Sequence, residues 1–159
     1  MDESKKAKLG QYISSVRELF KQADSWLKEK NLKTAWEDTQ IHEEASGPYT
    51  APMLKIFDPN SQCIAELRPI GTWIIAAKGR IDLIGKLDKT TLVELDKGGP
   101  HITTSISVGD QAEKPISKPL YKGIDAAGWY WIEDKLRGKA HLINKDLFLE
   151  LLAEVSDYE

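Results

Sequence analysis

The hydrophobic positions at the start of the chain recur with the period of an α-helix. Between Ser4 and Lys30 the apolar residues form three rows with a spacing of seven, namely Leu9, Val16 and Ala23, then Tyr12, Leu19 and Trp26, then Ile13, Phe20 and Leu27. A stripe of this width is typical of a helix that packs across a sheet of its own domain. The alternative is that part of the stripe forms a homodimer interface with a second copy of the chain.

Beyond this helix the hydrophobic period changes from about 3.6 to two, which indicates β-strands. Short turns rich in Gly, Pro, Asn and Asp, such as Asp58 to Ser61, separate the segments. Connections this short cannot hold crossover helices, so we expect a largely antiparallel meander. The predicted strands are 34–42, 51–58, 62–68, 72–78, 80–85, 90–96, 101–108, 128–134 and 139–143.

The end of the chain returns to helical spacing. Asn144 is suited to be the N-cap, and an apolar face follows it, made of Leu147, Phe148, Leu151, Leu152 and Val155. The sequence therefore predicts an α+β fold with a long N-terminal helix, a curved antiparallel sheet and a short C-terminal helix. A length of 159 residues suits one domain over residues 1–159.

One segment, residues 109–127, shows neither period and contains Pro115 and Pro119. Loops of this length are uncommon in small domains, and they often act as lids or binding loops or are disordered. Its lysines are equally consistent with a solvated loop.

Composition excludes several classes of protein. Hydrophobic residues make up 41% of the chain and charged residues 30%, with a formal net charge of −3, which is typical of globular proteins. The sequence contains no basic patch of the kind that binds nucleic acids or anionic membranes. The longest apolar run, Trp73 to Ala77, is far shorter than the ~20 residues of a membrane span.

The lone cysteine, Cys63, cannot form an intramolecular disulfide, and the charged N-terminus lacks the apolar segment of a signal peptide. Both features favour the cytoplasm. Alternation places Cys63 inward with Ala65 and Leu67, so we expect a buried, unreactive thiol.

Motifs for cofactors and common catalytic sites are absent from the sequence. It has no phosphate-binding loop, dinucleotide fingerprint or nucleophile elbow. His42, His101 and His141 are isolated, so a zinc site would have to assemble from distant segments. We therefore expect no cofactor.

Acidic residues in two successive predicted strands form the first candidate site. If Ile81 and Leu83 point inward, Arg80 and Asp82 point outward, and if Val93 and Leu95 point inward, Glu94 and Asp96 point outward. The three carboxylates would then share one face and could hold Mg²⁺. The alternative is a solvated face on which Arg80 pairs with Glu94 or Asp82.

This stretch resembles the restriction-endonuclease-like PD-(D/E)xK nucleases, in which an Asp on one strand and an acid-x-Lys on the next hold the metal and the catalytic lysine. The resemblance implies that Asp82 is the first acid and Glu94 the second. Asp96 stands where that family has its lysine, and Lys97 follows one residue late and faces the other side of the strand. The resemblance therefore implies a degenerate metal-dependent hydrolase.

An aromatic strand forms the second candidate site. Trp129 and Trp131 share one face, while Tyr130 and Ile132 share the other. The two tryptophans either pack against a helix or form a wall of a binding pocket under residues 109–127. Arg137 lies close enough in sequence to receive an anionic group.

The sequence favours a cytoplasmic, non-enzymatic protein that binds another protein or a small molecule, because no complete catalytic set can be identified. The alternatives are a hydrolase that uses a divalent metal at Asp82, Glu94 and Asp96, and a carrier with an aromatic pocket. The candidate binding residues are Arg80, Trp129, Trp131 and Arg137.

Overall fold

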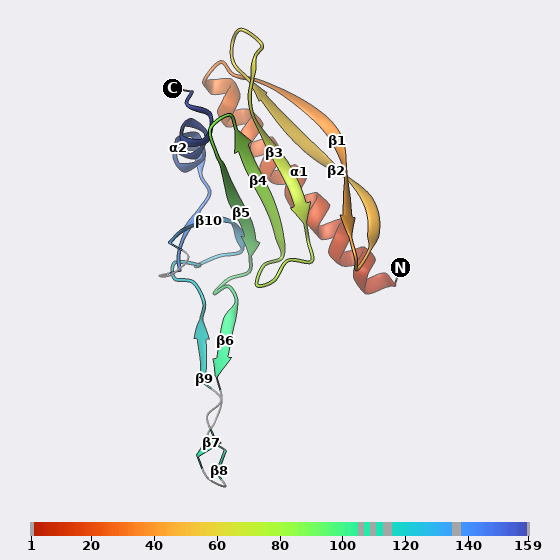
Figure 1. Ribbon diagram of the computed structural model, residues 1–159, viewed down its shortest axis with the longest axis vertical. Helices are drawn as coiled ribbons and strands as arrows, with labels where there is room; N and C mark the ends of the chain where they lie inside the picture. The colour runs from red at the N-terminus through yellow and green to blue at the C-terminus, as the bar shows by residue number, and fades with distance from the viewer. Residues whose placement is uncertain (1, 105–106, 109–110, 113–115, 135–137, 159) are drawn as a thin grey trace.

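The computed structural model describes residues 2–104, 107–108, 111–112, 116–134 and 138–158, and the predicted α+β fold is confirmed (Figure 1). The long N-terminal helix, α1, spans Glu3–Glu29, with Asp2 as its N-cap. Asn31 follows it with a left-handed φ of 61°. This conformation ends a helix, and a short side chain such as Asn tolerates it well.

The sheet is the antiparallel meander that the sequence predicts, and it is not closed. Each neighbouring pair of its seven strands is antiparallel, in the order β1-β2-β3-β4-β5-β10-β11. The strands are β1 (Lys33–Glu43), β2 (Gly47–Phe57), β3 (Cys63–Gly71), β4 (Gly79–Gly85), β5 (Lys89–Leu95), β10 (Gly128–Asp134) and β11 (Lys139–Leu142).

Between β5 and β10 the chain leaves the sheet and returns. This excursion contains β6 (His101–Thr104), β7 (Ser107–Val108), β8 (Gln111–Ala112) and β9 (Ile116–Pro119), with β6 paired to β9 and β7 to β8. Figure 1 shows these strands extending away from the seven-stranded sheet. The prediction of one strand over 101–108 and a loop over 109–127 is therefore wrong for the parts described. Residues 105–106, 109–110 and 113–115 of those two predictions lie outside the described residues.

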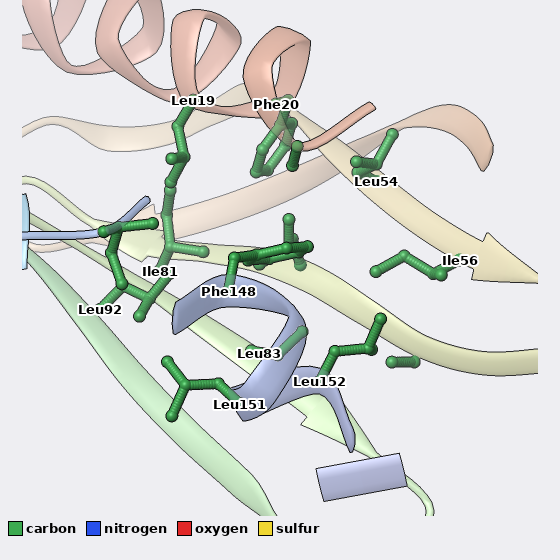
Figure 2. Packing of buried hydrophobic residues seen from close by; sticks show 14 of the residues in the cluster. Leu19, Phe20, Leu54, Ile56, Ile81, Leu83, Leu92, Phe148, Leu151 and Leu152 are labelled. Atoms are coloured by element: carbon green, nitrogen blue, oxygen red, sulfur yellow. The ribbon is translucent and has the colours of Figure 1, made fainter. Parts of the chain in front are cut away.

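Both helices pack on one face of the sheet and share its hydrophobic core. The C-terminal helix α2 (Lys145–Ser156) begins at the predicted N-cap, because the Asn144 side chain accepts a hydrogen bond from the backbone N–H of Leu147. Figure 2 shows the core residues of α1, the sheet and α2 converging, among them Leu19, Phe20, Leu54, Ile81, Leu83, Leu92, Phe148 and Leu151.

The apolar stripe of α1 packs on the chain's own sheet, as one of its two interpretations expects. Six of its nine residues are buried, namely Tyr12, Val16, Leu19, Phe20, Ala23 and Leu27. Leu9, Ile13 and Trp26 are only partly buried. In the part of the chain that the structure describes, neither helix is long and apolar enough to cross a bilayer.

Two local predictions are wrong. Residues 72–78 form a turn between β3 and β4 rather than a strand, and its Ala76 has a φ of 64°. Cys63 is exposed rather than buried, because a register shift between β2 and β3 interrupts the alternation at that point. Ile64 and Ala65 are both buried as a result.

Candidate functional site

A pocket lies on the open face of the sheet, opposite the helices. Ile81 and Leu83 of β4 point into the helix-covered core, so Arg80 and Asp82 point to the open face. The pocket has a volume of about 560 Å³ and lies over β4, β5 and β10. It is lined by Ile74, Arg80, Lys89, Thr90, Thr91, Val93, Tyr121, Trp131 and Ile132.

The polar wall of this pocket is an ion pair between Arg80 and Asp82. The Arg80 Nε donates to Asp82 Oδ1 at 2.9 Å, and Nη2 donates to Oδ2 at 3.0 Å. On the neighbouring strand, the Thr91 hydroxyl donates to Asp82 Oδ1 at 3.0 Å. Asp82 is only 3% exposed. The carboxylate is therefore buried with both of its oxygens hydrogen-bonded, and it holds the guanidinium in one orientation.

The strand register explains why these groups meet. Asp82 is the partner of Thr91, and Arg80 is the partner of Val93, so their side chains share the open face. Tyr130 of β10 is also a partner of Val93. The floor of the pocket is thus set by backbone pairing, which makes it rigid.

Arg80 also has unused hydrogen-bonding capacity. Its side chain is 34% exposed, and within the described residues its Nη1 has no protein partner. The hydrogen bonds to Asp82 raise the pKa of the guanidinium, which stays charged. Lys89, an exposed residue of the same face, adds a second positive charge. The pocket therefore has a cationic end beside an apolar surface.

The loop that carries Ile74 is fixed by a carboxylate from β1. Glu43 accepts hydrogen bonds from the backbone N–H groups of Thr72, at 3.2 Å, and Trp73, at 3.0 Å, and from the Tyr49 hydroxyl. Burial, followed by the hydrogen bond to Glu43, raises the pKa of Tyr49. Ile75, at the tip of this loop, is 97% exposed. The wall of the pocket at Ile74 is thus anchored at its base.

The predicted acidic face does not form. Glu94 is the partner of Gly79, which places it on the helix side of the sheet, opposite Asp82. Asp96 lies beyond the end of β5 and pairs with Lys78 at 3.2 Å. Among the described residues, no three His, Cys, Asp or Glu side chains are grouped as a metal site requires. Of the two ion pairs that the sequence allows for Arg80, the structure contains the one with Asp82 and not the one with Glu94.

The structure separates the predicted binding residues. Trp129 is buried in the helix-side core and donates from Nε1 to the Ser15 carbonyl at 3.3 Å. Trp131 donates from Nε1 to the Thr90 hydroxyl at 3.0 Å and borders the pocket that Arg80 lines. Arg137 lies outside the described residues. Arg80 and Trp131 therefore both line one pocket, and Trp131 also packs against the helix-side core that contains Trp129.

Several pocket residues were not singled out from the sequence. The sequence predicts Val93 in the interior and Ile74 in a strand, so neither is expected at a pocket. Tyr121 lies within the segment 109–127, whose length alone was a signal of function. The register that brings them together is a tertiary property that local patterns do not contain.

Comparison with models of protein families, with curated proteins and with solved structures finds no match for this chain.

Proposed function

We propose that this protein is a non-enzymatic binding protein that takes a small, largely apolar molecule into the open-face pocket. The observation that carries the proposal is the pocket itself, about 560 Å³ in volume and lined by Ile74, Val93, Ile132 and Tyr121. Small-molecule sites have volumes of about 300–1,000 Å³ and combine apolar walls with a few fixed polar groups. The Arg80–Asp82 pair supplies such groups.

The state of the polar groups favours binding over catalysis. Both carboxylate oxygens of Asp82 already accept hydrogen bonds, and the Thr91 hydroxyl donates to one of them. A general base or nucleophile needs a free lone pair directed at the substrate. These residues instead support one another, which suits a rigid recognition surface.

A reducing compartment such as the cytoplasm is part of the proposal. It is supported by the single cysteine, Cys63, whose exposed thiol has no second cysteine in the chain to pair with.

The proposal is tested with Nile red, an uncharged apolar dye whose fluorescence rises in apolar sites. We expect saturable binding to the native protein. The Val93→Trp variant places a bulky ring on the pocket floor, so the affinity for the dye should fall by about tenfold or more. The Lys21→Gln variant, on the exposed side of α1, is the control and should bind like the native protein.

Equal affinity of the Val93→Trp variant and the native protein would place the dye elsewhere and remove the proposal. The thermal midpoint of each variant shows whether its fold is retained. If Val93→Trp is poorly folded, Ile132→Gln, at another lining position on β10, repeats the test with less steric strain.

A further inference from the structure

We infer that the ligand of the open-face pocket is a monoanion, with one carboxylate or sulfonate held by Arg80 and an apolar body over Val93 and Ile132. This inference rests on the proposed function and names the class of ligand. It follows from the geometry of Arg80 and from the balance of charge around it.

Arg80 is prepared for an anion before any ligand arrives. Two of its nitrogens, Nε and Nη2, are bound by Asp82, which fixes the plane of the guanidinium. The Thr91 hydroxyl in turn fixes Asp82. Nη1 remains without a partner within the described residues, on a side chain that lines the pocket. A charge-assisted hydrogen bond to an immobilised donor costs little conformational entropy.

The charges of the pocket match a single negative charge. Arg80 and Lys89 are positive and Asp82 is negative, which leaves one positive charge in excess. Arg68 of β3, the partner of Asp82, is paired with Glu66 and adds no net charge. Glu94 lies on the other face, and Asp96 is paired with Lys78. A dianion such as phosphate would be left with an unbalanced charge beside the buried Asp82 carboxylate, and a cation would be repelled by Arg80 and Lys89.

The rest of the pocket selects an apolar body. Ile74, Val93 and Ile132 provide aliphatic surface, and the aromatic residues Tyr121 and Trp131 also contribute to the lining. An aromatic acid and a medium-chain fatty acid share this chemistry, so both are compared in the test.

The experiment measures dissociation constants by isothermal titration calorimetry for matched naphthalene compounds. We expect 1-naphthoate to bind about tenfold or more tightly than the neutral 1-naphthamide, and 1-naphthylmethylamine to bind most weakly. Decanoate replaces 1-naphthoate in a parallel arm and separates aliphatic from aromatic ligands. Inorganic phosphate alone should give no measurable heat of binding.

Variants assign the preference to Arg80. Arg80→Lys keeps the positive charge but loses the planar fork, so the ratio of naphthoate to naphthamide affinity should fall to about threefold or less, with naphthamide affinity unchanged. If this variant is poorly folded, the pair Arg80→Met and Asp82→Leu together removes both charges and tests the same ratio. Lys21→Gln should retain the native ratio.

The outcomes separate this inference from the proposed function. Equal affinity for naphthoate and naphthamide, with Nile red still bound at Val93, overturns the monoanion and leaves the binding function standing. An anion preference that persists in both Arg80 variants also overturns the inference. Absence of binding by every naphthalene, by decanoate and by Nile red overturns both.

Discussion

The hydroxyl of Tyr12 donates a hydrogen bond of 2.8 Å to the backbone carbonyl of Arg80, 68 positions later in the chain. The same hydroxyl accepts a hydrogen bond of 3.1 Å from the backbone N–H of Gly71. One side chain of α1 therefore joins the end of β3 to the start of β4. It also holds the backbone of the residue that lines the pocket.

Replacing Tyr12 by Phe removes both hydrogen bonds and leaves the Gly71 N–H and one lone pair of the Arg80 carbonyl unsatisfied. Each net contribution is about 0.5–1.5 kcal/mol, so we expect the free energy of unfolding to fall by about 1–3 kcal/mol. Urea denaturation measures this. Tyr158→Phe is the control, because the Tyr158 hydroxyl makes no hydrogen bond within the described residues; a loss of equal size there would contradict the assignment.

Because its pKa is raised, Tyr12 should also make the protein less stable in alkaline solution. Burial, only partly opposed by the hydrogen bond from Gly71, raises the pKa of the Tyr12 phenol above its usual value of about 10. The folded state then holds its proton more tightly than the unfolded state does. This contribution to stability is complete below pH 10 and is lost progressively as the pH rises above 10.

The measurement is the free energy of unfolding between pH 9 and pH 11.5. Each such group contributes a slope of up to about 1.4 kcal/mol per pH unit above pH 10. Tyr12→Phe should remove the contribution of one titrating group from the slope of unfolding free energy against pH. Tyr49→Phe should do the same, because the pKa of Tyr49 is also raised. Identical slopes for Tyr12→Phe and the native protein would mean that Tyr12 does not titrate differently in the two states.

Gly85 marks a close approach between β4 and the end of α2. A Cβ at this position would lie 2.3 Å from the carbonyl oxygen of Val155, a backbone atom that cannot turn aside. We expect Gly85→Ala to lower the free energy of unfolding by about 1–3 kcal/mol. A Cβ added at Gly10, in an exposed turn of α1, would meet no other part of the protein within 4 Å. Gly10→Ala should therefore raise the free energy of unfolding by about 0.5–1 kcal/mol. Thermal unfolding of the two variants compares them, and a neutral Gly85→Ala would show that α2 can shift.

The two helix caps should differ in their importance. Asn144 caps α2, which carries the buried residues Phe148, Leu151 and Leu152. Asn144→Ala should cost about 1 kcal/mol of global stability. Asp2 caps α1 where its first residues are exposed, so Asp2→Ala should only fray that end and cost less. Urea midpoints measure both, and equal losses would contradict this ranking.

Divalent metals provide a check on the register of β4 and β5. Because Glu94 lies on the face opposite Asp82, millimolar Mg²⁺ or Mn²⁺ should not raise the thermal midpoint. A metal at 100 times its dissociation constant would stabilise the protein by about 2.7 kcal/mol. A rise that disappears in Asp82→Ala would show that Asp82 takes part in a metal site.

Residue patterns alone predicted the elements whose signals are long or repeated. The α1 stripe has three rows, so single exceptions did not hide it, and Asn144 has the side chain that a helix start requires. Short turns between apolar segments were sufficient for an antiparallel meander. These features depend on neighbours in sequence, which is why they were accessible.

The candidate site depended on the phase of β5, which the sequence leaves ambiguous. Leu92 and Val93 are adjacent and both apolar, so either can be the inward residue. The structure buries Leu92 completely under the helices and leaves Val93 in the pocket. With Leu92 rather than Val93 pointing inward, every side chain of β5 changes face, and Glu94 lies on the helix side. The apolar run 73–77 has the composition of a strand but forms a turn, whose start is held by Glu43 through the N–H groups of Thr72 and Trp73.

The chain departs from the sheet after Leu95 and re-enters it at Gly128, and these two residues are partners across β5 and β10. The long excursion between them therefore begins and ends at adjacent points of an otherwise continuous ladder. The part of it nearest the sheet packs against the strands, because Ile124 is buried with Leu95, Tyr130 and Ala140, whereas β6 and β9 extend away from them. Arg80 belongs to the ladder and Tyr121 to the excursion, so a change at Tyr121 would alter one wall of the proposed pocket and leave the strand that carries Arg80 in place.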